Sequence, residues 1–406
     1  MTVRVSKPAI NLREKVSELD KPTGLKGNEL MRSETTQEAR DLIGAGRKNL
    51  LINGACNVAQ RGTTSTSTTY GSVDRMYYTH NGVNEACTQA QHALTSSDTG
   101  PWAAGFRNSY HITNGNQSGP DAADVIITRY LIEAQDIANS GWDYTSSSSY
   151  ITLSFWVKAS VAQTYYVRLE SQDGTAQNYS FAIALSANIW TKITKTIPGN
   201  SNLQFDNNAD MGLKIEWTLY RGTDSTTFGH TNDTWAAYAG SSRVPDMTGT
   251  WYTTNDATFE YTGIQLEVGS IATEFEHRSY GEELALCQRY YIQYGPNSAL
   301  ARFPMMGECT GASVAQYPLQ FPVMMRGGTG GVSLTTNGSA TDYQIYSANQ
   351  SKPCSSITLA ITFKNPDSGC WGVRINMNRT AGDLTAGRAA QAYAASTSIL
   401  GFSREL

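Results

Sequence analysis

The sequence has few charged residues and no excess of either sign. Charged residues make up 16% of the 406 residues, and 31 Lys and Arg stand against 35 Asp and Glu, for a formal net charge of -4. A protein that coats nucleic acid draws much of its affinity from Lys and Arg that neutralise phosphates. The charge balance therefore argues against that class, and we expect no nucleic-acid partner.

Long apolar runs are also missing. A helix needs about 20 predominantly apolar residues to cross a bilayer, and the longest apolar runs here are a few residues. The opening MTVRVSKPAINLREK has no apolar stretch of the kind found in a secretory signal peptide. We therefore expect neither membrane insertion nor Sec export.

Cysteine and histidine are sparse and scattered. The six cysteines form no CxxC pair, which excludes a zinc knuckle or a dithiol redox motif, and whether Cys354 and Cys370 pair stays open. The five histidines form no HExxH, and there is no GxSxG elbow. His277 is therefore expected to be a hydrogen-bonded structural residue, and the chain is not expected to be an enzyme.

What the sequence does contain is a long series of short β-rich runs. Between Asn49 and about Phe275 the predicted strands cover 49–54, 74–79, 106–113, 123–133, 149–160, 164–171, 178–185, 190–197, 211–220 and 258–269. In ITLSFWVK, Ile151, Leu153, Phe155 and Val157 alternate with Thr152, Ser154, Trp156 and Lys158. About ten strands without long helices between them indicate an all-β fold, an antiparallel jelly-roll sandwich.

The flanking regions differ from this jelly roll. Residues 1–48 are rich in mixed charge and predict an N-terminal arm with short helices, one of them between Thr35 and Gly44. Residues 282–291 predict a short helix, which is followed by a second set of strands that predicts a smaller β-sandwich. The expected domains are therefore 1–48, 49–278 and 279–406.

Several motifs resemble a domain of bacteriophage virion fibre proteins. They are GRKNLLINGACNVAQRG (46–62), DRMYYT, SFWVKAS and TGIQLEVGSIATEFEHRSYGEELALCQRYY (262–291), and VSKPAINLREKVSEL is similar to the opening of marine phage structural proteins. The resemblance implies a jelly roll like those of carbohydrate-binding modules, followed by a short helix and a β-domain that forms homotrimers. It further implies a virion surface protein made in the bacterial cytoplasm and anchored through residues 1–48 to a tail or capsid protein.

Host surface glycan is the expected ligand, because a pyranose stacks its apolar face on Trp or Tyr. Aromatic residues within loops rich in Gly, Ser and Asn are the candidates: Trp102, Trp142, Tyr144, Trp235 and Tyr238. Trp156, Trp190 and Trp217 are instead expected to pack within sheets. The expected function is that of a tail-fibre-like protein that binds this glycan during host adsorption. A capsid head fibre or decoration protein is the alternative, and a glycan hydrolase a remote one, since no pattern pairs carboxylates such as Glu170 and Glu216.

Two further expectations concern anchoring and metal. The apolar residues of the arm would be buried on a virion partner: Val5, Ile10, Leu12, Val16 and Leu19. No cofactor is required by any motif. Asp206 and Asp210 in QFDNNADMG are weak candidates for a calcium site, and a hairpin turn explains them equally well.

Overall fold

A computed structural model describes most of the chain. The described residues are 27, 29–30, 32, 48–295, 302–327, 331–365, 369–394 and 398–406. The anchoring residues Val5, Ile10, Leu12, Val16 and Leu19, and the helix expected between Thr35 and Gly44, lie outside them and stay predictions.

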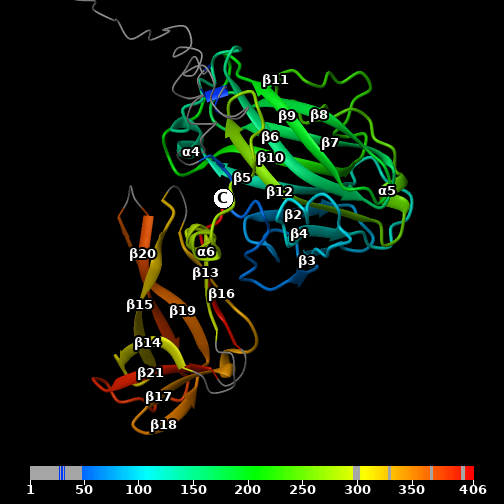
Figure 1. The fold of residues 1–406 in the computed structure, drawn as a ribbon. Helices are drawn as coiled ribbons and strands as arrows, with labels where there is room; N and C mark the ends of the chain where they lie inside the picture. Colours follow the sequence, from blue (N-terminus) through cyan, green and yellow to red (C-terminus); the bar gives the residue numbers. More distant parts are fainter. Residues whose placement is uncertain are drawn as a thin grey trace, which may run out of the picture.

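The first body is a sandwich of two six-stranded antiparallel sheets (Figure 1). One sheet, here called the β12 sheet, has the order β1-β3-β4-β12-β6-β9, and the other, the β10 sheet, has the order β11-β8-β7-β10-β5-β2. The β12 sheet comprises β1 (Thr64–Ser65), β3 (Thr88–Ala93), β4 (Asn108–Thr113), β12 (Thr258–Val268), β6 (Tyr150–Ala159) and β9 (Thr191–Pro198). The β10 sheet comprises β11 (Ala236–Ala237), β8 (Gln177–Leu185), β7 (Gln163–Ser171), β10 (Met211–Arg221), β5 (Val125–Glu133) and β2 (Met76–Asn81). Short helices α4 (Ala134–Ala138) and α5 (Thr250–Thr253) lie in connections.

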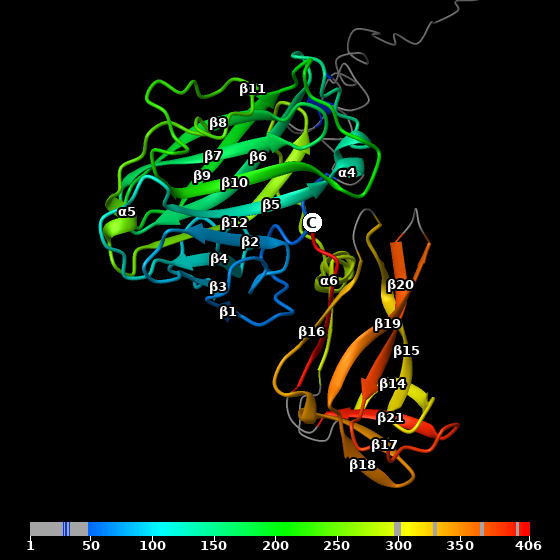
Figure 2. The same ribbon diagram turned by 180° about the vertical axis from the view of Figure 1, so that it is seen from behind.

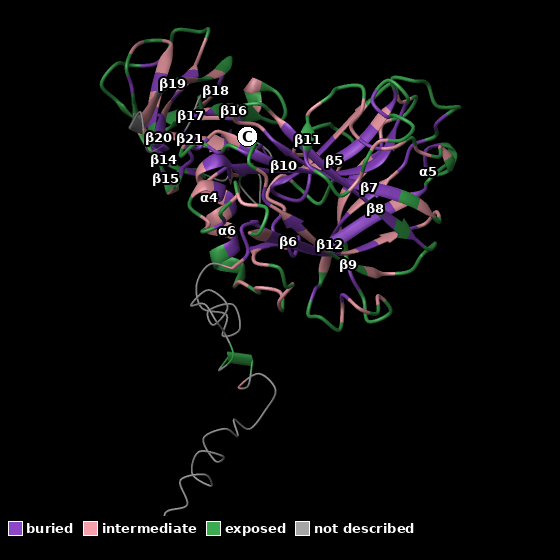
Figure 3. Ribbon diagram, turned by 90° about the horizontal axis from the view of Figure 1, so that it is seen from above, coloured by how far each residue is buried: buried purple, intermediate pink, exposed green. Residues whose placement is uncertain are grey.

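The predicted alternation on β6 is confirmed. Ile151, Leu153, Phe155 and Val157 are each 0% exposed and belong to the core between the two sheets. Trp156 and Lys158 point to the other face and are partly exposed. Buried residues follow the strands of both sheets, and exposed residues gather in the loops (Figure 3). The all-β class is therefore confirmed, and its cause is the burial of one face of each sheet.

One local prediction is wrong, and one strand is not predicted at all. Residues 49–54 form bends and turns instead of a strand, because Asn53 and Cys56 take positive φ values of 60° and 57°. Leu50, Leu51 and Ile52 are nonetheless buried, which explains their strand-like composition. Strand β3 was not predicted, since its sequence TQAQHA is polar.

The second body is also β-structure. A seven-stranded antiparallel sheet has the order β18-β17-β21-β14-β15-β20-β19, and a three-stranded sheet has the order β13-β22-β16. The two sheets share one hydrophobic core. The larger sheet comprises β18 (Gln350–Pro353), β17 (Tyr343–Ser347), β21 (Ala389–Ala394), β14 (Arg302–Cys309), β15 (Val314–Met325), β20 (Gly369–Asn378) and β19 (Ser356–Asn365). The smaller sheet comprises β13 (Tyr291–Tyr294), β22 (Leu400–Ser403) and β16 (Ser333–Thr336). A 3-10 turn, η1 (Ala340–Asp342), precedes β17.

Helix α6 (Tyr280–Gln288) lies at the junction of the two bodies, and the C-terminus ends beside it (Figures 1 and 2). Ser279 is the N-cap of this helix and forms a capping box with Glu282. Cys287 and Tyr290 pack on Ile52 and on the C-terminal Leu406. The segment predicted as a short helix is thus the connection that seats one β-body against the other.

Candidate functional site: an aromatic patch and a polar row on the β12 sheet

Partly exposed aromatic side chains gather on the outer face of the β12 sheet. Trp156 projects from β6, Trp190 directly precedes β9, and Trp102 lies in the loop that joins β3 to β4. These three tryptophans and Phe275 pack around a small buried cluster made by Ala55, Leu94 and Phe106. We call Trp102, Trp156, Trp190 and Phe275 the aromatic patch.

Polar groups hold this patch in place. The Asp98 carboxylate Oδ1 accepts hydrogen bonds from Trp190 Nε1 and Lys158 Nζ, both at 3.0 Å. Burial acts to raise the pKa of Asp98, but hydrogen bonds from Trp190, Thr95 and Lys158 outweigh it and lower the pKa to about 2. The Arg107 guanidinium lies 3.8 Å from the centre of the Trp102 ring. Fixed charges thus lie directly beside aromatic rings.

A row of polar side chains crosses the same face next to the patch. Glu260 on β12 is paired with Lys158 on β6 and with His111 on β4, and His92 projects from β3. Lys158 Nζ lies 2.8 Å from Glu260 Oε1, and Ser109 Oγ donates to Oε2 at 2.8 Å. Burial would raise the pKa of Glu260, but the neighbouring His111, His92 and Lys158 side chains lower it. Glu260 is therefore a carboxylate kept charged beneath an open surface.

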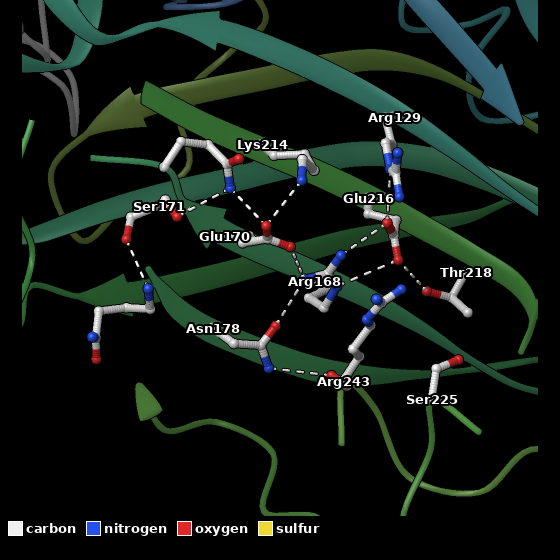
Figure 4. Close-up of polar contacts among 12 residues, drawn as sticks. Arg129, Arg168, Glu170, Ser171, Asn178, Lys214, Glu216, Thr218, Ser225 and Arg243 are labelled. Atoms are coloured by element: carbon white, nitrogen blue, oxygen red, sulfur yellow. Dashed lines mark hydrogen bonds and ion pairs between the residues drawn. The ribbon is translucent and has the colours of Figure 1, made fainter. Parts of the chain in front are cut away.

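The outer face of the β10 sheet carries a different, closed arrangement (Figure 4). Glu216 is 0% exposed and accepts from Arg129, Arg168 and Arg221 at 2.9, 2.9 and 2.7 Å. Glu170 pairs with Arg168 and with Lys214. Because each of these carboxylates is buried against more than one cation, the network leaves neither carboxylate open to a ligand.

This network also bears on glycoside hydrolysis. Burial acts to raise the pKa of Glu170, but Arg168 and Lys214 outweigh it and lower the pKa to about 2. The pKa of Glu216 is likewise well below its usual range, because Arg168, Arg221 and Arg129 outweigh its burial. A general acid for glycoside cleavage needs a raised pKa. These two carboxylates are therefore unsuited to that role.

The structure brings only one of the five predicted glycan residues into the aromatic patch, namely Trp102. Trp142 is 3% exposed within the main core, and Trp235 is 7% exposed and donates its Nε1–H to the Pro198 carbonyl at 2.7 Å. Neither indole offers an open ring face in this structure, so neither joins the aromatic patch. Tyr144 packs edge-on against Phe205 at 5.0 Å. The ring centre of Tyr238 lies 5.5 Å from Arg243 and 5.9 Å from Arg168, over the opposite sheet.

Trp156 and Trp190 are members of the patch that sequence reasoning assigned to sheet packing. The alternation around Ile151 to Lys158 did contain a signal, since it placed Trp156 on the face opposite to the core residues. Trp190 lies just outside its strand, which the sequence could not delimit. Trp217 is 0% exposed, as expected.

The remaining predicted residues lie elsewhere. Asp206 is exposed, and Asp210 lies 3.9 Å from the Arg326 guanidinium. Within the described part of the chain, neither belongs to a set of three converging metal ligands. Cys354 and Cys370 are both buried, and Cys370 Sγ donates to the Gly372 carbonyl oxygen at 3.1 Å. His277 Nε2 lies 3.1 Å from the Ala104 carbonyl oxygen, which confirms its hydrogen-bonded position.

Comparison with known proteins gives similarity at the level of solved structures. No family model and no curated protein matches the chain. One similar structure is a carbohydrate-binding module of family 4, at 14% identity and a TM-score of 0.28, covering 53% of this chain and 98% of that one. Another is the N-terminal cellulose-binding domain of a Cellulomonas fimi β-1,4-glucanase, at 10% identity and a TM-score of 0.25, covering 53% and 99%.

A third similar structure is a xylan-binding domain from Paenibacillus barcinonensis, at 10% identity and a TM-score of 0.24, covering 52% of this chain and 94% of that one. Among the described residues, no helix is long and apolar enough to cross a membrane.

Proposed function

We propose that this chain is a surface component of a bacteriophage virion that binds host glycan through the aromatic patch. The observation that carries the glycan part is the convergence of Trp102, Trp156 and Trp190 with the charged groups of Asp98 and Lys158. An indole ring offers a flat apolar surface for a pyranose, and charged side chains beside it hydrogen-bond the hydroxyl groups.

Replacing Trp102 by Ala is the direct test of this site. We expect the affinity for a bound glycan, identified on an array of bacterial surface polysaccharides, to fall about tenfold or more, since a central aromatic anchor contributes most of a binding energy. Isothermal titration calorimetry measures the loss. Phe228→Ala is the matched control, because Phe228 is 93% exposed and lies outside the patch. An equal loss in both variants, or glycan binding unaffected in Trp102→Ala, would contradict the proposal.

The virion part of the proposal rests on the sequence resemblance and on a surface of the second body. Met306 on β14 and Met324 on β15 are 61% and 43% exposed, and Trp371 on β20 is 46% exposed. These three side chains project from the solvent-facing side of neighbouring strands β14, β15 and β20. An exposed apolar surface shared by several strands is a candidate contact for a partner. Copies of the same chain, closed by threefold symmetry, are the partner that we infer.

The oligomeric state tests this association. We expect the purified chain to have the mass of three copies by light scattering, and Met306→Glu to release monomers, because a charge at an apolar contact is costly to bury. Ile271→Glu is the control, since Ile271 is 74% exposed on the first body.

On the particle we expect density at the tail in multiples of three, while density over the capsid lattice would favour a head decoration protein. A wild-type monomer would overturn the trimer.

A further inference from the structure

Three potential metal ligands converge at one end of the polar row on the β12 sheet. His92 Nδ1 and His111 Nδ1 lie 3.1 and 3.4 Å from Glu260 Oε2, and the three atoms are all within 4.8 Å of one another. Zinc binds imidazole nitrogen at about 2.0–2.1 Å in tetrahedral geometry, which places neighbouring ligand atoms about 3.3 Å apart. The two distances to Glu260 match the edges of such a tetrahedron.

The state of His111 is a second observation. Its Nδ1 is buried and makes no hydrogen bond, although it lies close to the Glu260 carboxylate. A buried polar atom without a hydrogen bond calls for an explanation, and a bound ion is one that supplies the missing partner. His92, on the neighbouring strand, has a side chain that is 47% exposed and leaves this end of the row open to solvent.

We propose that His92, His111 and Glu260 form a binding site for a divalent transition metal ion of the zinc class. Two imidazoles and one carboxylate are a ligand set that zinc accepts, and the open side at His92 leaves a fourth position for water or a ligand oxygen. The site does not depend on glycan binding by the aromatic patch, since the metal alone tests it.

The strands and the neighbouring side chains hold these ligands in place. His111 and Glu260 are directly opposite each other on β4 and β12, so sheet register alone brings them together. Ser109 Oγ donates to Glu260 Oε2, and Lys158 Nζ contacts the other oxygen at 2.8 Å. Such outer contacts orient a ligand, whereas the positive charge of Lys158 opposes a cation. Lys158 therefore sets an upper limit on the affinity.

The experiment is a titration of the full chain with ZnCl₂ after chelator treatment, under reducing conditions. The six cysteines are buried, so they do not compete for added metal in the folded protein. We expect one zinc ion per chain by calorimetry. In His92→Ala the affinity should fall about tenfold or more. His277→Ala should bind as the wild type does, since His277 is an exposed histidine outside the row.

Two further measurements keep the test decisive. Substitution of Co²⁺ for Zn²⁺ should give the visible absorption of a tetrahedral site, and this absorption should be absent in His92→Ala. Lys158→Met should raise the affinity, because it removes the opposing charge; it also keeps a long side chain against Trp190. The proposal is overturned if the wild type binds no stoichiometric zinc, or if His277→Ala loses zinc as fully as His92→Ala while circular dichroism shows both folded.

Discussion

Replacing Glu216 by Gln is expected to lower the free energy of unfolding by about 3–5 kcal/mol. The side chain is 0% exposed and lies between the guanidinium groups of Arg129 and Arg168 (Figure 4). It also pairs with Arg221 at 2.7 Å. Glutamine keeps the shape but removes the charge, which leaves buried arginines without their shared carboxylate. Denaturant unfolding followed by tryptophan fluorescence measures the change.

Asp233→Asn is the matched control for this prediction. Asp233 forms an ion pair with Lys195 at 2.6 Å, but its side chain is 55% exposed. Water and salt screen such a pair, so its loss should change the free energy of unfolding by less than about 1 kcal/mol. If Glu216→Gln and Asp233→Asn lowered the free energy of unfolding by similar amounts, burial would not determine how much the Glu216 cluster contributes to stability.

The pH dependence of the free energy of unfolding is a second test of the Glu216 cluster. A carboxylate with a lowered pKa in the folded state stabilises the protein above its unfolded pKa and loses that contribution as the pH falls. For Glu170 the loss runs from about pH 4.5 down to about pH 2, and the lowered pKa of Glu216 acts in the same direction. Glu216→Gln should therefore unfold with a shallower dependence on pH below 4.5 than the wild type.

The strands that bury one complete face were the most predictable part of the fold. On β6, the apolar residues Ile151, Leu153, Phe155 and Val157 occupy every second position, and the apolar residues of β10 do the same. This period of two predicts a strand that buries one face in the core. Strand β3 has no alternating apolar pattern, because its sequence TQAQHA places only small and polar side chains on both faces. It became a strand through pairing with β4, which is a tertiary cause.

The candidate site also combines a residue that local sequence predicts with contacts that only the tertiary structure creates. Trp102 was predicted to lie in a loop because its immediate neighbours include glycine and proline, which favour turns. This signal comes from adjacent residues alone. The convergence of Trp190 with Asp98 joins residues 92 positions apart, and no spacing in the sequence encodes it. His92, His111 and Glu260 come from three strands that the order β3-β4-β12 makes neighbours. Long-range sheet order, which single residues do not specify, thus creates the site.

Replacing Glu405 by Gln is expected to loosen the junction between the two β-bodies. The Glu405 carboxylate is 7% exposed and pairs with Arg75 and, at 3.1 Å, with Arg61, both from the first body. The Arg75 guanidinium also lies 3.5 Å from the ring centre of Tyr290 and donates to the Leu131 carbonyl oxygen at 2.6 Å. Removing the carboxylate leaves two cations facing each other in a buried contact, which costs about 3 kcal/mol or more.

Hydrogen exchange separates this loosening from general destabilisation. If the free energy needed to open the junction falls by about 3 kcal/mol, amides of β13 and β22 should exchange about 100-fold faster. This conversion uses about 1.4 kcal/mol for each factor of ten. Amides of β10 in the first body should exchange as in the wild type. Asp383→Asn is the control, because its pair with Arg379 is within the second body and the Asp383 side chain is 43% exposed. If β10 and β22 both exchanged faster, Glu405 would stabilise the whole chain and not the junction alone.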